Sequence, residues 1–342
     1  MIGRAPTPGG NPRAPRWFRR RQQSGPSHRP RPPLVHDGTA ARSRQLTVRL
    51  LVVTRVGSVQ SIWRYPVKSM MGDRFSSLPV DDHGVAGDRG WAVRDEVRGG
   101  IRGAKKIGGL MRLHARYLEE PQPGGSPPPI EITSSDGQAV RSDAEDVDER
   151  LSQLLDHPVS LWPLRPATDL DHYRRGAPDT DDFDSELRAI FGRERDEPLP
   201  SFEGLPLDVL VEYESAPGTY FDAFPIHIVT DRSLETLASL APGSDFDVRR
   251  FRPNLVVAVE PDLPGEFPEQ GWPGRTFRVG DAELEVTAPC PRCVMVTRQF
   301  ADLDEDRQVL RTVVRHADQH VGVYANVVRA GTLEEGTAVA LG

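Results

Sequence analysis

The sequence predicts an α+β protein that is mainly β, with a β-barrel-like domain and a smaller N-terminal β-rich domain. The 342 residues include 31 Gly and 32 Pro, which divide the chain into short segments. Most of these segments alternate apolar and polar residues, as half-buried strands do. Only three or four segments place apolar residues at helical spacing. A doubly wound parallel sheet, in which strands and helices alternate, is therefore not expected.

Composition divides the chain into four parts. Residues 1–45 contain ten Arg, eight Pro and five Gly with almost no apolar periodicity, so they cannot offset the entropy lost on ordering. We expect a disordered Arg/Pro-rich tail over 1–55 and a β-rich domain over 56–166. A linker rich in Asp, Arg and Pro follows over 167–200, and the barrel-like domain occupies 201–342.

The first domain should begin with short antiparallel strands. Residues 56–66 alternate and end at Pro66, and further strands are expected within 74–82 and 84–96, with turn residues between them. Residues 98–117 begin basic and glycine-rich. This composition favours a solvated loop, because no phosphate-binding glycine motif is present.

A helix and a hairpin should complete the first domain. Residues 130–135 and 139–142 are separated by turn residues and predict a hairpin. Residues 143–155 place apolar side chains at helical spacing and lead into a strand over 159–164.

The second domain should combine strands with two clear helices. A helix after residue 229 can be capped by Thr230 or Asp231. The second helix is expected over 307–320. Strands are expected at 226–229 and 255–259, as a pair within 277–289, and as a closing pair at 322–328 and 337–342.

The charge distribution limits the classes of partner. The net charge is −7, and residues 1–45 carry ten Arg and one Asp, so the remaining chain is acidic at −16. An acidic body argues against general nucleic-acid binding, and an anionic ligand must be held by a few placed basic residues. No stretch approaches the roughly 20 apolar residues of a membrane span. We expect a cytoplasmic protein.

Several polar residues lie at the ends of predicted strands, where side chains converge on a cleft. Lys68 and Ser69 follow the first strand, and Arg89 precedes another. Arg252 lies between Phe251 and Pro253, which should pin it near the fold. The adjacent pair at 249–250 is expected at a solvated edge.

Both cysteines of the chain lie within residues 288–297, on either side of an arginine. The apolar residues 294–297 follow Cys293 at once, so this cysteine should lie where a loop enters a strand. Four interpretations of Cys290 and Cys293 stay open. They are a thioredoxin-like pair, a zinc site completed by His316 and His320, a disulfide, or one thiolate that binds a metal within a cofactor.

The chain resembles the MOSC-domain proteins with an N-terminal MOSC region, the type that includes the mitochondrial amidoxime-reducing component and its bacterial relatives. The resemblance covers residues 56–342 and rests on five motifs taken together. These are YPVKS at 65–69, GDR.W at 87–91, FRPN at 251–254, CxRC at 290–293 and GxY at 322–324.

The resemblance implies roles for seven residues. Cys293 would ligate molybdenum as the second cysteine of its motif. The residues implied to surround the pterin and its phosphate are Lys68, Ser69, Arg89, Arg252, Asn254 and Tyr324. A phosphate dianion explains why an acidic protein keeps basic residues there. We further expect the cofactor to bridge the two domains.

The sequence also departs from the family. Two hydroxyl residues that relatives place before a proline fall here on Ala223 and Phe224, and Thr230 and Ser233 nearby are equally well explained as helix caps. Two cysteines cannot hold an iron–sulfur cluster, which needs four ligands, so no such cluster is expected. No pyridoxal-phosphate domain is present in the sequence, and no chemistry of that cofactor is expected.

The resemblance implies a molybdenum-dependent oxidoreductase that reduces small N-hydroxylated compounds by two electrons. A separate ferredoxin-like or cytochrome b5-like protein would donate the electrons. The alternative is a module that carries the molybdenum cofactor, or sulfur on Cys293, without turnover. Neither nucleic acid nor a membrane is expected as a partner.

Overall fold

The computed structural model describes residues 53–180 and 182–342. The tail predicted over residues 1–55 therefore lies outside the described residues, except for its last three positions. Strands account for 33% of the structure and helices for 22%. The predicted mainly β fold class is confirmed.

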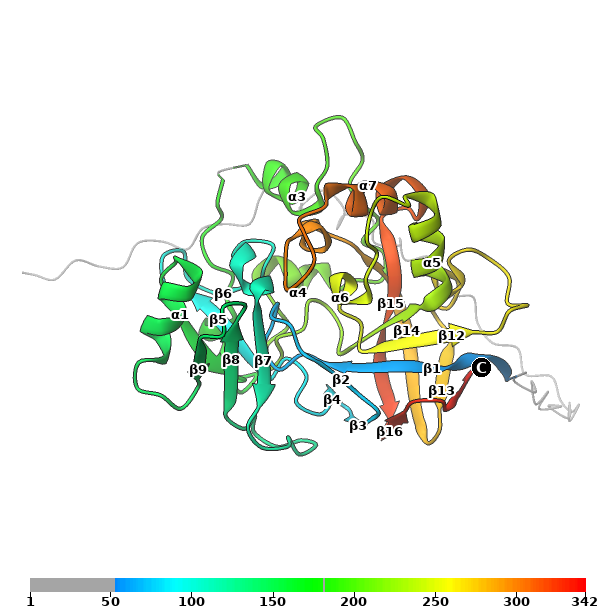
Figure 1. Ribbon diagram of the computed structural model, residues 1–342, viewed down its shortest axis with the longest axis horizontal. Coiled ribbons are helices and arrows are strands. Elements are labelled where there is room, and N and C mark those ends of the chain that lie inside the picture. Colours follow the sequence, from blue (N-terminus) through cyan, green and yellow to red (C-terminus); the bar gives the residue numbers. More distant parts are fainter. Residues whose placement is uncertain (1–52, 181) are drawn as a thin grey trace, which may run out of the picture. The chain divides into compact units, whose positions relative to one another are not determined.

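The central element is a closed barrel of seven strands (Figure 1). β1 (Thr54–Arg64) pairs with both β12 (Leu255–Val259) and β17 (Ala338–Leu341), and these two pairings close the sheet. The remaining barrel strands are β11 (Ile226–Thr230), β13 (Thr276–Val279), β14 (Ala282–Pro291) and β15 (His320–Arg329). All pairings in the barrel are antiparallel except β11 with β12. One barrel strand thus comes from the beginning of the described chain, and the other six follow residue 225.

The burial pattern of β1 helps to explain how it closes the barrel. Val56, Val59 and Ile62 are buried in the barrel core. They are spaced by three residues rather than two, and the register of β1 shifts twice, against β17 between Arg55 and Gly57 and against β12 between Val59 and Ser61. Bulges of this kind bend a strand, which helps a short sheet to close.

Three small sheets accompany the barrel. β5 (Trp91–Asp95) pairs with β6 (Ile101–Arg102) and β10 (Val159–Pro163). The predicted hairpin is confirmed as β8 (Ile130–Ser134) and β9 (Ala139–Arg141), and it pairs with β7 (Leu113–Tyr117). The third sheet contains β3 (Ser77–Asp81), β4 (Gly84–Val85) and β16 (Gly331–Glu334), and β2 (Asp73–Phe75) extends β1.

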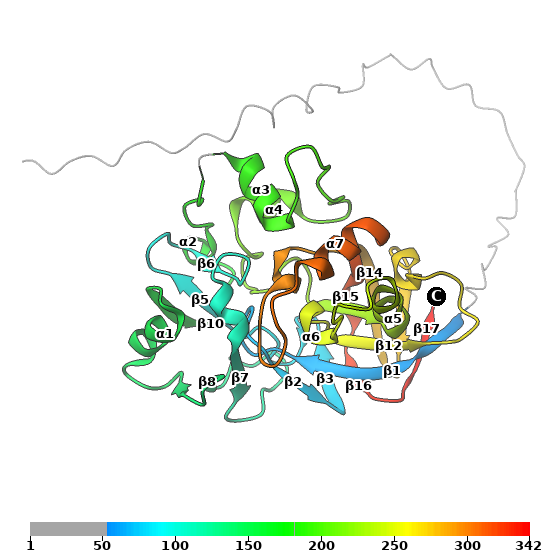
Figure 2. The ribbon, with the colours of Figure 1, turned by 45° about the horizontal axis from the view of Figure 1, so that its top comes forward.

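Helices are short and few. They are α1 (Val147–Leu155), α2 (Leu170–Tyr173), α3 (Phe183–Phe191), α4 (Leu207–Glu212), α5 (Asp231–Leu240), α6 (Val248–Phe251) and α7 (Arg307–His316), with 3₁₀ helices η2 (Gly108–Arg112), η3 (Pro268–Gly271) and η4 (Val294–Thr297). Thr230 caps α5 by accepting a hydrogen bond from the backbone N–H of Ser233. Of the two predicted capping residues, Thr230 and Asp231, the cap is therefore Thr230. Figures 1 and 2 show α3 near α7, and Arg311 of α7 donates to the carbonyl of Gly192, which ends α3.

Two predictions near the C-terminus are wrong in part. α7 ends at His316, because Asp318 and Gln319 adopt positive φ values of 47° and 63° and β15 begins at His320. His316 and His320 therefore do not share a helix, which removes the spacing that suggested a zinc site. The predicted closing strands exist as β15 and β17, but they are not neighbours in the barrel.

Within residues 53–180 and 182–342, no helix combines the length and apolar character needed to cross a membrane.

Candidate functional site

The predicted site residues lie at the ends of barrel strands and in the loops beside them. Lys68 and Ser69 lie in the turn after β1, and Arg89 lies in the turn before β5. Arg252 is the residue that ends α6, and Asn254 directly precedes β12. Tyr324 lies on β15, and Cys293 is the residue before η4. Four of these side chains, Lys68, Ser69, Arg252 and Asn254, are buried.

Three predicted site residues have an unusual backbone conformation. Ser69, Arg89 and Arg252 have φ values of 67°, 50° and 54°, and they are three of the seven non-glycine residues with positive φ in the described chain. Such conformations cost free energy in residues with a side chain, and they persist where the surroundings fix them. Here backbone hydrogen bonds hold two of them, Arg89 to the carbonyl of Tyr65 and Arg252 to that of Val248. Strain concentrated at these positions supports a functional site.

One hydrogen-bond network connects Arg89, Arg252 and Asn254. Asp88 forms an ion pair with Arg89 and accepts a hydrogen bond of 2.9 Å from the Asn254 amide. The Arg89 guanidinium also donates to the backbone carbonyl of Arg252 at 3.3 Å. Asp88 lies within the GDR.W motif but was not among the predicted residues.

Tyr65 is the platform for both guanidinium groups. The Arg252 guanidinium lies 4.2 Å from the centre of the Tyr65 ring, and that of Arg89 lies 4.8 Å from it. Arg252 donates to the carbonyl of Met70, while its other terminal nitrogen, Nη2, is buried without a hydrogen-bond partner. Burial, assisted by repulsion from Arg89, lowers the pKa of Arg252 to about 10. The site therefore holds a buried cation with an unused donor.

The cysteine loop differs from the prediction. β14 runs through Cys290 and ends at Pro291, so the strand precedes Cys293, and the residues after it form η4 rather than a strand. Pairing with β15 stops at Pro291, opposite His320. The turn is then stabilised by Arg250, which donates to the carbonyls of Val296 and Arg298.

Arg292 joins the cysteine loop to the loop of Arg252. Its guanidinium donates to the sulfur of Cys290 at 2.9 Å and to the carbonyl of Phe251 at 2.9 Å, while its Nε has no partner. Cys290 is fully buried, and burial raises the pKa of its thiol although Arg292 opposes the effect. Cys293 is partly exposed, and both cysteines are free thiols. Only Cys293 is thus positioned to meet a ligand.

Tyr324 lies against two rings beside the cysteine loop. The ring centres of Phe224 and His227 are each 5.6 Å from that of Tyr324. Burial raises the pKa of Tyr324, whereas burial and the charge of Arg292 lower the pKa of His227 to about 3, so this histidine is neutral near pH 7. Gly322 has a φ of 79°, and a Cβ there would lie 2.4 Å from the His227 ring, which explains the glycine of the GxY motif.

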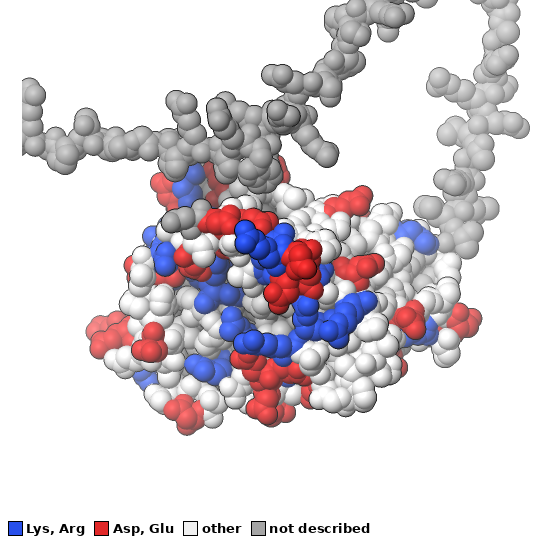
Figure 3. Space-filling view, turned by 90° about the horizontal axis from the view of Figure 1, so that it is seen from above, with Lys and Arg blue, Asp and Glu red and all other residues white. Residues whose placement is uncertain are grey.

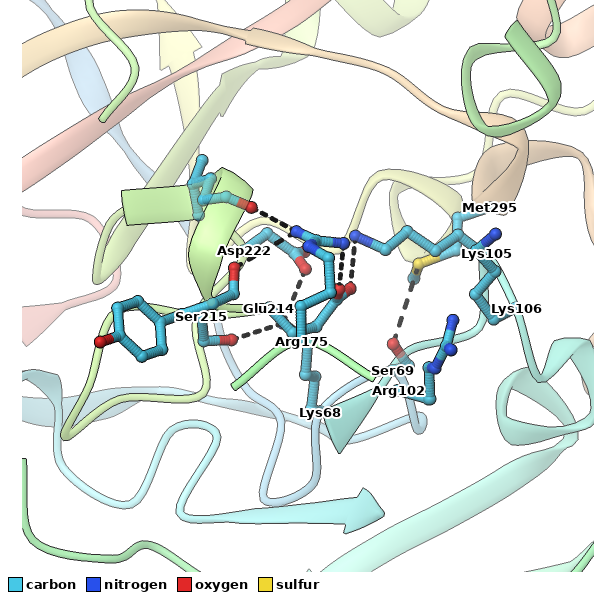
Figure 4. A network of polar contacts seen from close by, with 12 residues as sticks. Lys68, Ser69, Arg102, Lys105, Lys106, Arg175, Glu214, Ser215, Asp222 and Met295 are labelled. Atoms are coloured by element: carbon cyan, nitrogen blue, oxygen red, sulfur yellow. Dashed lines mark hydrogen bonds and ion pairs between the residues drawn. The ribbon is translucent and has the colours of Figure 1, made fainter. Parts of the chain in front are cut away.

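The neighbouring residues Ser69 and Lys68 contact different parts of the chain. The Ser69 hydroxyl lies 3.9 Å from the sulfur of Met295, two residues after Cys293. The Lys68 ammonium has four acceptors, which are the Ser215 hydroxyl at 3.2 Å, the carbonyls of Tyr220 and Phe221 at 2.9 and 3.2 Å, and Asp222 at 2.8 Å (Figure 4). Burial lowers the pKa of Lys68, and Asp222 opposes this effect.

Two expectations of solvated basic residues are wrong. Within 98–117, Arg102 is buried, and Lys105 and Lys106 expose only 20% and 11% of their side chains because each forms an ion pair. Arg250 is also buried, because backbone carbonyls take up its donors. The acidic partners of Lys105 and Lys106 lie more than 70 positions away in the sequence, so the local composition could not indicate these ion pairs.

Two buried arginines beside the cysteine loop lack a carboxylate partner among the described residues. Neither Arg252 nor Arg292 forms an ion pair with a carboxylate anywhere in residues 53–180 or 182–342. Burying a cation without a counter-charge is costly, so these two arginines fit an anionic ligand. Figure 3 shows Lys and Arg side chains gathered near the middle of one face, with acidic side chains beside them.

Sequence reasoning missed four residues that build this site. Tyr65, Asp88 and Arg292 lie inside the quoted motifs, so the motif itself was the available signal. Asp222 carries no local signal, because its role depends on a contact with Lys68 across 154 positions of the chain.

The fold and site define a MOSC-domain protein with an N-terminal barrel region. The family model of the MOSC domain matches residues 216–340, and that of the MOSC N-terminal beta barrel domain matches residues 56–158. The chain therefore belongs to the MOSC-domain proteins with this N-terminal region, as the sequence predicted.

Among individual relatives, the chain is similar to mitochondrial amidoxime reducing component 2 of Rattus norvegicus. The two are 27% identical over 326 residues, which cover 88% of each chain. Among solved structures, the YuaD protein of Bacillus subtilis is 12% identical with a TM-score of 0.37, covering 84% of this chain and 95% of its own. YiiM of Escherichia coli is 16% identical with a TM-score of 0.27, covering 37% and 58%. TM-scores this low carry no structural conclusion.

Proposed function

We propose that this protein binds the molybdenum cofactor and reduces small N-hydroxylated compounds by two electrons. The observation that carries the proposal is that two buried guanidinium groups on the loops beside the partly exposed thiol of Cys293, those of Arg252 and Arg292, form no ion pair with a carboxylate of residues 53–180 or 182–342. Arg250 also has no carboxylate partner there, but backbone carbonyls accept hydrogen bonds from all three of its guanidinium nitrogens. An anionic cofactor that also accepts a thiolate ligand satisfies both features.

In this proposal each residue has a distinct role. Cys293 supplies the metal ligand, and Arg252, with its unused Nη2 donor, contacts the phosphate. Arg89, Asn254 and Ser69 surround the pterin with Lys68 and Tyr324. Tyr65 and Asp88 hold the two arginines in place, since one contacts both guanidinium groups and the other pairs with Arg89. Cys290 is a buried partner of Arg292.

When bound, the cofactor supplies two-electron chemistry with transfer of an oxygen atom. Reduction of an N–OH group to N–H consumes two electrons and two protons and releases water. The electrons require a separate donor protein, which we propose to be ferredoxin-like or cytochrome b5-like. The relative's name includes amidoxime reduction, and this supports N-hydroxylated compounds as the substrate class. We place the protein in the cytoplasm.

The test is metal and pterin analysis of the purified protein, followed by a turnover assay. The protein should contain molybdenum and release a fluorescent pterin after oxidation. It should then reduce an amidoxime or a hydroxylamine with an artificial electron donor. Bound molybdenum without turnover would instead identify a carrier of the cofactor, and absence of molybdenum and pterin after expression in a host that makes the cofactor would refute the proposal.

A further inference from the structure

The chain contains only three lysines, and all three lie in one cluster. Lys68, Lys105 and Lys106 expose 3%, 20% and 11% of their side chains. Lysines are ordinarily among the most exposed residues, because their ammonium groups are strongly hydrated. A protein that uses arginine at nearly every other basic position has therefore kept lysine only at buried ion pairs (Figure 4).

Within the described residues, all acidic partners of these lysines lie on one stretch of the chain, which we call the connecting segment (residues 174–180 and 182–222). Lys68 pairs with Asp222 at 2.8 Å, and Lys105 pairs with Glu214 at 2.6 Å. Lys106 pairs with both Asp179 and Glu186, at 2.6 and 2.7 Å. Most of this segment lies between the two family matches, which end at residue 158 and begin again at residue 216.

Further polar contacts hold the connecting segment to the loop of the lysines. Arg102 donates to the carbonyl of Ala177, and Arg98 donates to that of Pro178 at 2.8 Å. Within the segment, Arg175 pairs with the second oxygen of Glu214 at 2.5 Å, so this buried carboxylate lies between two cations. These contacts fall near both ends of the segment, at residues 177–186 and at Glu214 and Asp222.

Apolar packing contributes little between the ends of the connecting segment. α4 buries no residue, and α3 buries only Glu186 and Ile190. Tyr173 directly precedes the segment, and Tyr220 lies near its C-terminal end. Each is 1% exposed, and their ring centres are 5.8 Å apart. The two ends are therefore anchored by aromatic packing. Around residues 191–202, the Phe191 and Phe202 rings pack 5.1 Å apart and Arg311 of α7 pairs with Glu197. On the side of the candidate site, the segment is held mainly by the lysine ion pairs.

The same contacts bring the connecting segment to the candidate site. Lys68 follows the first barrel strand, and Gly103 on the lysine loop lies so close to Ser69 that a Cβ there would be 2.8 Å from its hydroxyl. At the other end, Phe224 follows Asp222 by two positions and packs on Tyr324. The segment therefore lies across one side of the site.

We propose that Lys105 and Glu214 are positioning residues that hold the connecting segment over the candidate site. Lys106 and Lys68 complete the same set of ion pairs, so weakening these pairs frees the segment between its two aromatic anchors. The inference goes beyond the proposed function, because it concerns the segment whichever anion the site binds.

Amine labelling tests the proposal directly. With only three lysines and the N-terminal amine, an intact mass after treatment with an acetylating reagent counts the modified groups, and peptide masses assign them. In native protein at low salt, the lysines should react more slowly than those of the unfolded chain. Glu214→Gln should raise the labelling rate of Lys105 by about tenfold or more, because local opening limits access to paired side chains.

The matched control is Glu131→Gln, which removes the ion pair between Glu131 of β8 and Arg116 of the neighbouring strand β7. It should leave all three lysine rates unchanged. Glu214→Asp keeps the negative charge, so its lysines should react more slowly than those of Glu214→Gln. If the shape of the side chain and not its charge were decisive, Glu214→Asp would show no such recovery. If Glu214→Gln does not fold, wild-type protein at about 1 M salt provides the second test, since screening weakens partly exposed pairs. Lysine labelling should then rise while circular dichroism stays constant.

The proposal is overturned if wild-type lysines react as fast as those of the unfolded chain. It is also overturned if folded Glu214→Gln and high salt both leave the Lys105 rate unchanged. Labelling needs no cofactor, so this outcome is separate from the fate of the proposed function. In cofactor-loaded protein, Glu214→Gln should also speed release of the pterin into a chelating buffer, and Lys105→Arg should restore slow release relative to Lys105→Met.

Discussion

Two groups of buried or partly buried cations differ in how their charge is balanced. The paired cations each face a carboxylate of the connecting segment, and they are Lys68, Lys105, Lys106 and Arg175. The unpaired cations, Arg252 and Arg292, form no ion pair with a carboxylate of the described residues and contact only backbone carbonyls, an aromatic ring and a thiol.

The difference separates residues that hold the fold from residues that await a ligand. Both groups lose hydration on burial, but the paired cations recover much of that cost from nearby carboxylates. The unpaired cations have no such compensation within the described residues, so an anion that reaches them gains a strong interaction. The comparison leads to four predictions, in order of decreasing effect.

The largest effect should follow from changing the thiol that the unpaired cations surround. Cys293→Ser should reduce turnover to background and change the coordination of molybdenum, because only this cysteine is exposed to a ligand. Cys290→Ser is the matched control and should keep most of the activity. Activity assays with X-ray absorption spectroscopy measure both. Equal losses in the two variants would indicate a dithiol site instead.

Arg252→Met should lower the cofactor content of purified protein by about 10- to 100-fold. A charge-assisted hydrogen bond contributes roughly 1.5 to 3 kcal/mol, and Arg252 has a donor free for one. Arg249→Met is the control, because Arg249 is already paired with Asp247 and Asp302. Lys68→Ala should lower the content less than Arg252→Met, because the Lys68 ammonium already has four acceptors in the protein. An equal loss that does not add to that of Arg252→Met would show that both residues act on one phosphate.

The stability of ligand-free protein should distinguish the two groups of cations. Glu214→Gln should lower the free energy of unfolding by about 3 kcal/mol, because it leaves Lys105 and Arg175 buried without their counter-charge. Arg252→Met should leave stability unchanged or raise it, since it removes an uncompensated charge. Urea unfolding measures both variants. A comparable loss in Arg252→Met would show that Arg252 is held for the fold and not for a ligand.

The smallest effect is expected at Glu197 and Arg311, a partly exposed pair with two contacts of 2.6 and 3.0 Å. The hydrogen bonds from Arg311, with one from the backbone of Glu194, lower the pKa of Glu197 to about 2. A lowered pKa contributes stability above the ordinary carboxyl range that is lost as pH falls toward 2. Glu197→Gln should therefore cost about 0.5 to 1 kcal/mol at pH 7 and less at pH 3. Melting temperatures across this range measure the difference, and a constant gap would exclude the ionised pair as its cause.

Much of the fold could be predicted because the relevant patterns are local. The strand of β1, the hairpin of β8 and β9 and the Thr230 cap each depend on residues within a few positions of one another. The limits of such patterns are clear at η4, where a mostly β-branched apolar stretch forms a 3₁₀ helix. There a distant arginine, Arg250, donates to the carbonyl of Val296 and to that of Arg298 just after the helix.

Of the candidate site, only the residues that stand in recognisable motifs could be predicted from the sequence. Residues such as Arg252 and Cys293 stand in recognisable short sequences, and their residue types suit an anion and a metal. Sequence contained no indication that Tyr65 would contact both Arg89 and Arg252, since ring and guanidinium meet through folding. Nor did it show that Lys105 would be buried beside Glu214, 109 positions away.

Strand alternation, turn residues and residue chemistry are properties of neighbours in the chain, so the sequence alone led to a mainly β protein with a basic, thiol-containing site. Closure of the barrel by β1 and the pairing of each buried cation depend on distances between remote segments. The cost of burying a charge depends on its surroundings in space, and only the folded chain sets those surroundings. Tertiary structure therefore decided which basic residues hold the connecting segment and which remain free for an anion.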